Sequence, residues 1–329
     1  MKGRAGGFKA KGQTEMSVAF TFPGQGSQTV GMGKAMADEF TAARLVFEEV
    51  DDALGEKLSN IIWEGPEDQL QLTANAQPAL MAVSLATVRV MEAEGLDLAT
   101  DISYVAGHSL GEYSALCAAG TFSLADTARL LRIRGNAMQR AVPVGKGAMA
   151  AIIGLEFEDV EALCAAAAAT GVCQIANDNG GGQIVISGEK EAVEKAVALA
   201  TEKGAKRALL LPVSAPFHCS LMAPAADAME EALAEVRRGE PVVPVIANVR
   251  AAPVSDPDEI MKLLVEQVTG RVRWRETVSW FAANEIETLY EVGAGKVLTG
   301  LARRIERSLN GVAIGAPGDI DAALKAIKG

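Results

Sequence analysis

The stretch Gly107-His108-Ser109-Leu110-Gly111 is the strongest indication of the fold, because it lies between a predicted strand and a predicted helix. The apolar residues 102–106 before it indicate a buried strand, and the helix-forming residues 112–119 after it indicate a helix. A G-x-S-x-G sequence in this context forms a strained turn that exposes the serine hydroxyl. A chain with 33 glycines also produces the bare pattern by chance, so a plain turn is the alternative. The context favours Ser109 as a nucleophile.

Strands and helices alternate on either side of this turn. Residues 17–22 form an apolar strand that runs into a glycine loop at 23–28, and a helical pattern begins near Met32. A further helix is predicted from Pro78, a residue suited to a first helical turn, to Glu94. Later strands are predicted at 242–248 and 288–292, and later helices at 257–268 and 276–284, before a last pair of helices. The alternation predicts an α/β fold in which helices cover a mostly parallel sheet.

The middle of the chain follows a different order of elements. We predict the order β-α-β-β-α-β at residues 148–155, 159–169, 172–176, 183–187, 189–202 and 206–213. This order over about seventy residues matches the ferredoxin-like unit. We therefore expect residues 143–213 to form a small inserted domain, and residues 16–142 and 214–329 to form one large α/β domain.

The first fifteen residues differ in composition from the rest of the chain. Residues 1–15 carry four basic residues against one acid, and they lack the apolar core of a signal peptide. We expect a disordered extension, an upstream start or a remnant of cloning, with Met16 as a candidate natural start.

Composition and charge exclude several classes of protein. The 329 residues are 49% hydrophobic and 22% charged, which is typical of a soluble globular protein and excludes disorder. The net charge of −11 argues against binding to nucleic acid, which usually needs a basic face. The longest uncharged stretches contain polar residues and prolines, so we expect no membrane span. The four cysteines form no CxxC pair, so we expect reduced thiols, no metal site and a cytoplasmic location.

Two other glycine loops fail the patterns that bind phosphates. Gly24 and Gly26 would need a glycine at position 29 to complete the dinucleotide fingerprint, and that residue is Thr29. Gly295-Lys296 would need a glycine at position 290 to complete a P-loop, and that residue is Tyr290. Both nucleotide sites are therefore excluded.

A serine nucleophile needs a base, and the chain contains two histidines, His108 and His218. Side chains of adjacent residues at a strand end point to opposite faces, so His108 is poorly placed to take the proton of Ser109. His218 is the base by elimination, with a structural histidine as the alternative. The spacing identifies no acid that would complete a triad, and a backbone carbonyl can orient the imidazole equally well.

Arg134 lies on the apolar face of its predicted helix, where a charged side chain is unusual. In a helix over residues 126–141, Arg134 lies among apolar residues that include Met138, away from the face that carries the other arginines. A guanidinium on an apolar face must be paired. The partner is either a carboxylate of the protein, in an internal salt bridge, or a carboxylate of the substrate, which the fork geometry of arginine suits.

Taken together, these residues resemble a known family, the malonyl-CoA:acyl carrier protein transacylases of fatty-acid synthesis, and they are also similar to the acyltransferase domains of polyketide synthases. The resemblance runs from about residue 18 to residue 305. It is carried, in this order, by residues 22–28, 77–80, 107–115, 134–135, 147–150 and 217–218. One departure is Ala294, where the family more often has proline.

The resemblance implies a hydrolase-like large domain with a ferredoxin-like insertion, in agreement with the predicted strand order. It also implies roles for individual residues. Those roles are nucleophile for Ser109, base for His218, oxyanion hole for the backbone N–H groups of Gln25 and Leu110, and histidine-orienting carbonyl for Gln267. Arg134 would hold the free carboxylate of malonate, with Phe217 and Met138 as further substrate-binding residues.

The resemblance further implies that malonyl-CoA is a substrate and that acyl carrier protein is the partner, with no metal or other cofactor. We expect a monomer. The bulk of Phe217 favours malonyl over methylmalonyl groups, because it leaves little room for an α-methyl group.

Three alternatives remain open at this point. The same serine and histidine serve esterases and thioesterases of the α/β-hydrolase type, although those enzymes place the histidine near the C-terminus after an acid. Acyltransferases of polyketide pathways share the transacylase chemistry. A non-catalytic subunit that keeps the fold is the third alternative, and the intact set of Ser109, His218 and Arg134 argues against it.

Overall fold

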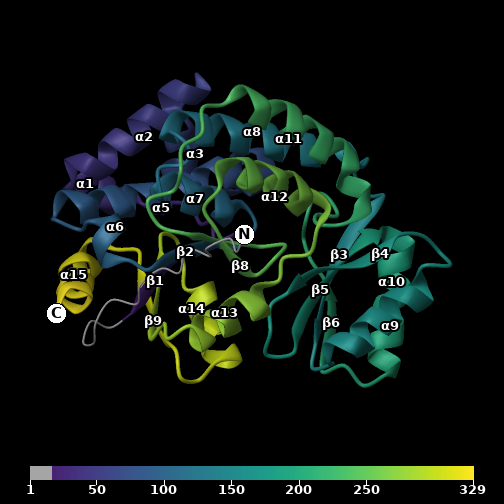
Figure 1. The fold of residues 1–329 in the computed structure, drawn as a ribbon. Helices are drawn as coiled ribbons and strands as arrows, with labels where there is room; N and C mark the ends of the chain where they lie inside the picture. The colour runs from purple at the N-terminus through teal and green to yellow at the C-terminus, as the bar shows by residue number, and fades with distance from the viewer. Residues whose placement is uncertain (1–16) are drawn as a thin grey trace, which may run out of the picture.

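The computed structural model describes residues 17–329, which contain two β-sheets (Figure 1). The extension predicted for residues 1–15 lies outside the described residues. Six strands form the larger sheet and four form the smaller one, at the opposite side of the molecule. Within residues 17–329, no helix is both long and apolar enough to cross a membrane.

The larger sheet has the strand order β10-β9-β1-β2-β7-β8. Its strands are β1 (Val18–Phe22), β2 (Tyr104–Gly107), β7 (Val245–Ala247), β8 (Ala252–Val254), β9 (Thr288–Val292) and β10 (Asn310–Ile314). All neighbouring pairs are parallel except β7 and β8. The prediction of a mostly parallel sheet is therefore confirmed. The edge strands β8 and β10 were not predicted, because both are partly exposed and neither contains an apolar run longer than three residues.

The smaller sheet has the strand order β4-β5-β3-β6, with antiparallel neighbours throughout. Its elements follow one another as β3 (Gly147–Ile153), α9 (Phe157–Ala167), β4 (Cys173–Asp178), β5 (Gln183–Glu189), α10 (Lys190–Glu202) and β6 (Arg207–Leu210). A separate hydrophobic cluster joins the two helices to this sheet. The predicted sequence of elements occurs here, and β6 ends earlier than the predicted strand over residues 206–213.

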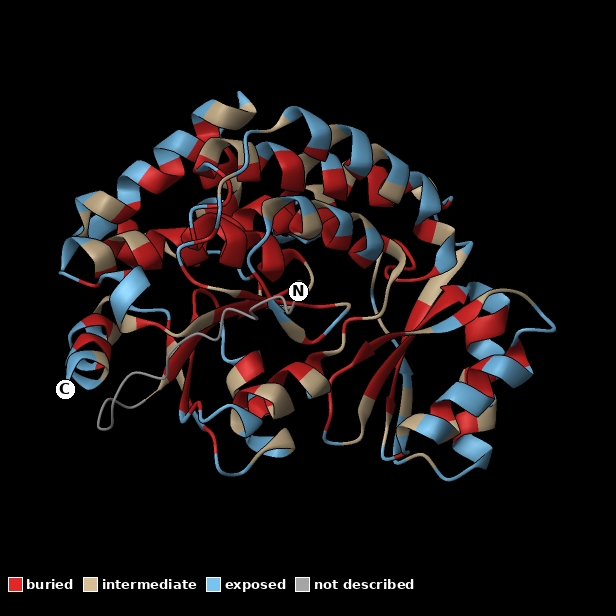
Figure 2. Ribbon diagram, viewed as in Figure 1, coloured by how far each residue is buried: buried red, intermediate tan, exposed pale blue. Residues whose placement is uncertain are grey.

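Helices cover both faces of the larger sheet. Together with two short 3₁₀ segments they are α1 (Lys34–Glu39), α2 (Thr41–Leu54), α3 (Leu58–Glu64), α4 (Glu67–Gln71), α5 (Thr73–Ala93), α6 (Leu98–Asp101), α7 (Leu110–Ala118), α8 (Leu124–Ala141), η1 (Ser220–Met222), α11 (Ala223–Glu235), α12 (Pro257–Thr269), α13 (Trp274–Ala283), α14 (Val297–Ile305), η2 (Pro317–Asp319) and α15 (Ile320–Lys328). The helices turn buried faces inward and exposed faces outward (Figure 2).

The side chains of β1 show how the sheet joins two cores. Val18, Phe20 and Phe22 belong to the largest hydrophobic cluster, which includes α5, α7 and α8, whereas Ala19 belongs to a second cluster with α13 and α14. Alternate residues of a strand point to opposite faces, so a strand that is apolar throughout contributes to both cores. The five buried residues of β1 reflect this position.

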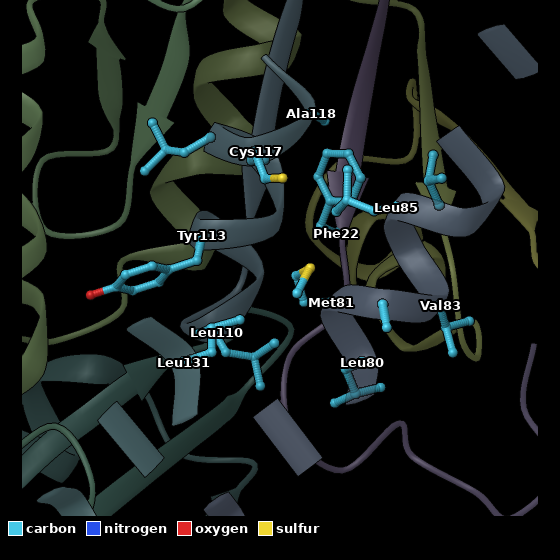
Figure 3. Close-up of a cluster of buried hydrophobic side chains, with 14 of the residues drawn as sticks. Phe22, Leu80, Met81, Val83, Leu85, Leu110, Tyr113, Cys117, Ala118 and Leu131 are labelled. Carbon is cyan, nitrogen blue, oxygen red and sulfur yellow. The ribbon is translucent and has the colours of Figure 1, made fainter. Parts of the chain in front are cut away.

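Helix α7 lies in the centre of the largest cluster, directly behind the turn that carries Ser109. All nine of its residues are buried. Leu110 and Tyr113 of this helix belong to the same buried cluster as Phe22 of β1 and as Met81 and Leu85 of α5, and Figure 3 shows the Tyr113 ring on the side of α7 away from Phe22. This packing fixes the first turn of α7 against the sheet.

The prediction that a helix begins at Pro78 was wrong, because α5 begins at Thr73 and Pro78 lies inside it. Seventeen residues of α5 are buried. A helix that is buried on nearly all sides has no clear amphipathic period that would mark its start. Proline is typical of the first turn of a helix, because it lacks the N–H that the interior of a helix uses.

Candidate active site

The turn between β2 and α7 holds Ser109 in a strained backbone conformation, with φ 54°. The two glycines of the motif permit the close packing around it. A Cβ atom on Gly107 would lie 1.9 Å from the carbonyl carbon of Gly111, and one on Gly111 would lie 2.3 Å from the carbonyl oxygen of Phe22. Because these neighbours are backbone atoms, they cannot move aside as a flexible side chain can. The sequence motif therefore corresponds to a steric requirement of this turn.

The structure brings Ser109 and His218 together across 109 positions of sequence. Ser109 Oγ lies 2.7 Å from His218 Nε2. On the other side of the ring, Nδ1 lies 2.9 Å from the carbonyl oxygen of Gln267 and 3.1 Å from that of Gly270. Carbonyl oxygens only accept hydrogen bonds, so Nδ1 carries the hydrogen and Nε2 of the neutral ring accepts from Ser109. Backbone carbonyls thus orient this histidine in place of an acid.

His218 is held in its neutral form. Burial, followed by the nearby positive charge of Arg134, lowers the pKa of His218 to about 3. The ring is 4% exposed. A neutral imidazole at physiological pH is the form that can accept a proton from a serine hydroxyl.

Arg134 lies in α8 and is 1% exposed. Its Nη1 donates to Gln77 Oε1 at 2.8 Å, and its Nη2 donates to Gln267 Oε1 at 2.8 Å and to Ser109 Oγ at 3.2 Å. Within residues 17–329 these hydrogen bonds go to amide and hydroxyl oxygens and to no carboxylate, and the buried Nε has no partner. Burial lowers the pKa of Arg134. The guanidinium therefore reaches Ser109 Oγ and keeps an unused donor.

Gln77 and Met138 lie beside this guanidinium. Gln77 Nε2 is 3.8 Å from Met138 Sδ, and both side chains are buried. Met138 was expected near Arg134, but no role was expected for Gln77, because the predicted helix began one residue after it. Phe217 is buried beside His218 and packs in the largest cluster.

The backbone N–H groups of Leu110 and Gln25, the two expected oxyanion donors, both lie close to the turn at Ser109. Leu110 is the first residue of α7, and an N–H in the first turn of a helix has no acceptor within that helix. Gln25 follows Gly24 in the loop after β1, and a Cβ on Gly24 would lie 2.7 Å from the carbonyl oxygen of His108. Because Phe22 pairs with Gly107 in the sheet, the loops after β1 and β2 leave the same edge.

Asn248 lies at the end of β7, the strand beside β2, and holds the turn at Ser109 by two hydrogen bonds. No sequence motif pointed to this residue. Its Oδ1 accepts from the N–H of Ser109 at 2.8 Å, and its Nδ2 donates to the carbonyl oxygen of Gly107 at 2.7 Å. It directly follows β7, which pairs with β2. A polar residue at the carboxyl end of a parallel strand is the signal that could have identified it.

The second histidine has a different environment. His108 Nε2 lies 2.9 Å from Asn179 Oδ1, and its ring lies 5.5 Å from the ring of Trp274. Burial lowers the pKa of His108. These contacts direct the imidazole of His108 toward the smaller sheet.

A cleft of about 420 Å³ reaches His218 from the side of the smaller sheet. Its walls include Cys164 of α9 and Cys173 of β4 on one side, and Thr269 and Arg271 on the other. A molecule that enters between the two sheets can therefore approach the base. Within residues 17–329, no group of three or more His, Cys, Asp or Glu side chains is arranged to hold a metal ion.

Comparison with known proteins identifies the family. Residues 19–313 match the acyl transferase domain family. The malonyl CoA-acyl carrier protein transacylase of Escherichia coli K12 is 47% identical over 307 residues, which cover 93% of this chain and 98% of that protein.

Two solved structures are similar over nearly their whole length. The acyl-carrier-protein S-malonyltransferase of Bartonella henselae is 66% identical, with a TM-score of 0.94 over 95% of this chain and 100% of that one. A malonyl-transacylase in complex with a type II polyketide-synthase acyl-carrier protein is 42% identical, with a TM-score of 0.91 over 94% and 99%. The chain is an acyltransferase and belongs to the malonyl CoA-acyl carrier protein transacylase family.

Proposed function

We propose that this enzyme transfers a malonyl group from CoA to the phosphopantetheine thiol of acyl carrier protein, through a malonyl ester of Ser109, and so supplies fatty-acid synthesis. One observation carries the proposal. Ser109 Oγ lies 2.7 Å from His218 Nε2 and 3.2 Å from Arg134 Nη2, so a nucleophile, a base and a buried cation meet at one atom. The relatives named above support the choice of donor and acceptor.

The first half-reaction uses the neutral His218. Nε2 takes the proton of Ser109, and Oγ forms a bond to the carbonyl carbon of the malonyl thioester. The backbone N–H groups of Leu110 and Gln25 stabilise the negative charge on the carbonyl oxygen, and one such donor contributes about 3–4 kcal/mol. The C–S bond then breaks, and the imidazolium returns its proton to the CoA thiolate.

The second half-reaction reverses these steps with a different thiol. The phosphopantetheine thiol of the carrier protein gives its proton to His218 and attacks the malonyl ester, and Ser109 leaves with that proton. The two thiols use the site in turn, which gives ping-pong kinetics. Each step needs only the groups named here, so the proposal includes no metal and no other cofactor.

Arg134 acts as the clamp for the free carboxylate of the malonyl group. Its Nε has no partner within the protein and its Nη2 lies 3.2 Å from Ser109 Oγ, so in the proposal the two-pronged guanidinium binds the oxygens of a carboxylate beside the nucleophile. Met138 and Phe217 line the same part of the site in the proposal. A bulky ring at Phe217 favours malonyl over methylmalonyl.

Intact mass spectrometry tests the proposal directly. After incubation with malonyl-CoA, the wild-type chain gains the mass of one malonyl group, and Ser109→Ala gains none. Arg134→Ala loses malonylation by about a hundredfold in rate while acetylation from acetyl-CoA falls much less, because only the malonyl group carries the carboxylate that the clamp binds. An adduct that persists in Ser109→Ala contradicts the mechanism, and equal loss for both acyl groups contradicts the clamp.

We also propose that residues 143–213 form a ferredoxin-like domain inserted between residues 16–142 and 214–329 of the large domain. The element order of the smaller sheet and its separate hydrophobic cluster support this division. We further propose that the enzyme is a monomer that acts in the cytoplasm, where its acyl substrates are made and its four cysteines stay reduced.

A further inference from the structure

A buried carboxylate lies beside the site and takes no part in the mechanism above. Glu112 is in the first turn of α7, three residues after Ser109, and is 2% exposed. Its Oε2 accepts from Gln267 Nε2 at 2.7 Å and from the N–H of Asn248 at 3.1 Å. Burial raises the pKa of Glu112 to about 7, and the hydrogen bond from Gln267 limits the rise. A carboxylate is costly to bury, so its contacts call for an explanation.

The contact with Gln267 fixes the direction of that side-chain amide. Gln267 Nε2 donates to Glu112 Oε2 and to the carbonyl oxygen of Ser109, at 2.7 and 3.0 Å. Its Oε1 must therefore face the other way, where it accepts from Arg134 Nη2 at 2.8 Å. A reversed amide would place its NH₂ group against the guanidinium and its oxygen against two acceptors. Glu112 is the acceptor whose oxygen disfavours this reversed state.

The side-chain amide of Gln267 also separates Glu112 from Arg134. A direct Glu112–Arg134 pair would occupy the donors that the proposed clamp offers to substrate, whereas the amide oxygen of Gln267 uses one hydrogen bond of Nη2. Burial lowers the pKa of Arg134, and the neighbouring Tyr113 and, after it, Glu112 oppose that effect. The arginine is thereby held in place and remains charged.

We propose that Glu112 is a positioning residue of the carboxylate clamp, because it fixes the Gln267 amide that holds Arg134 toward Ser109. This inference rests on the proposed role of Arg134 in binding the malonyl carboxylate. Glu112 touches neither substrate nor reacting atoms, so its effect is on the preference for malonyl over acetyl groups.

Three substitutions of Glu112 separate its hydrogen bond from its charge, with the ratio of kcat/KM for malonyl-CoA over acetyl-CoA as the readout. Glu112→Ala removes the acceptor, and Glu112→Asp keeps the charge but withdraws it by one methylene group. Each lowers the ratio by about tenfold or more, because the clamp is misplaced. Glu112→Gln keeps an oxygen that can accept from Gln267 and Asn248, so its ratio stays within about threefold of wild type.

Glu291 provides a matched control. It is another fully buried carboxylate, and it accepts from the N–H groups of Leu298 and Thr299 at the start of α14, away from the site. Glu291→Ala lowers the melting temperature, as Glu112→Ala does, but leaves the malonyl-to-acetyl ratio unchanged. This comparison separates a loss of positioning from a general loss of stability.

The outcomes distinguish the inference from the function on which it rests. An unchanged ratio in Arg134→Ala overturns both the clamp and the role of Glu112. A shifted ratio in Arg134→Ala with a wild-type ratio in Glu112→Ala overturns the role of Glu112 alone. Equal shifts in Glu112→Gln and Glu112→Ala also overturn it, because charge would then be the cause. If Glu112→Ala does not fold, the aspartate and glutamine variants decide, since positioning shifts the ratio only for aspartate.

Discussion

The turn at Ser109 and the carboxylate clamp proposed at Arg134 fix polar atoms only 3.2 Å apart, but they do so by different means. The turn is built from five consecutive residues whose glycines let backbone atoms approach one another closely. The clamp is built from side-chain amides on α5 and α12 that hold an arginine on α8. A turn that is formed by consecutive residues is visible as a motif in the sequence. An arrangement of side chains from separate helices leaves no such motif.

The two constructions also differ in how they respond to change. Backbone atoms around the turn are fixed by the sheet and by α7, so an added methyl group has no space. The ends of glutamine and arginine side chains can move by small torsions, so the clamp can adjust in part. Substitutions of the glycines in the turn should therefore be more severe than substitutions of the residues that hold the Arg134 side chain in place.

Gly111→Ala gives the largest expected effect. The new Cβ would lie 2.3 Å from the carbonyl oxygen of Phe22, which forces α7 away from the end of β1. We expect kcat/KM for malonyl-CoA to fall by at least about a hundredfold, because the nucleophile and the N–H of Leu110 are displaced. Steady-state kinetics and the melting temperature measure this.

Gly300→Ala is the matched control for that variant. Gly300 lies within α14, and nothing lies within 4 Å of a Cβ built on it. Alanine is the better helix former by about 1 kcal/mol, so this variant keeps full activity and is slightly more stable. Full activity in Gly111→Ala would show that the turn is as adaptable as the clamp.

Phe217→Ser gives a smaller effect, on selectivity. Removing the ring makes room for an α-methyl group, and one methyl group in a pocket contributes about 1–3 kcal/mol. We expect the ratio of kcat/KM for malonyl-CoA over methylmalonyl-CoA to fall by about tenfold. Phe217→Leu keeps most of the bulk and should keep most of the ratio. An unchanged ratio in the serine variant would remove Phe217 from the specificity pocket.

The pH profile of the malonyl-CoA half-reaction gives the smallest expected effect. Since the pKa of His218 is lowered to about 3, the base stays neutral well below its ordinary value of 6.5. The rate of acylation should therefore change little between about pH 5.5 and 7.5. An acid limb centred near pH 6.5 that persists in Glu112→Gln would show that His218 is not held neutral by burial and by Arg134.

Protein stability must be followed in the same experiment. The folded-state pKa of His218 lies below its unfolded value, so the unfolded chain binds the proton more tightly. Protonation of His218 therefore lowers the free energy of unfolding progressively as the pH falls from 6.5 toward 3. Circular dichroism at each pH separates that loss of folded protein from a true change in rate.

Local patterns identified the three side chains that the structure brings together, but they did not identify the amides that hold those side chains in place. Ser109 stood in a motif with a steric cause, and His218 followed by elimination in a chain with two histidines. Arg134 followed from the angle of its side chain around a helix. The contacts of Asn248 and Gln267 join segments more than a hundred positions apart, and each depends on which oxygen or nitrogen of an amide points inward. Such contacts arise from tertiary packing, which a single sequence does not display.

The positive φ of Ser109 also affects the stability of the folded chain. A non-glycine residue held in such a conformation costs about 1–3 kcal/mol, and glycine could adopt the same backbone without that cost. The most stable chain with this fold would therefore lack the hydroxyl group. Serine at position 109 therefore lowers the stability of the folded chain, and its hydroxyl group is present only at that cost.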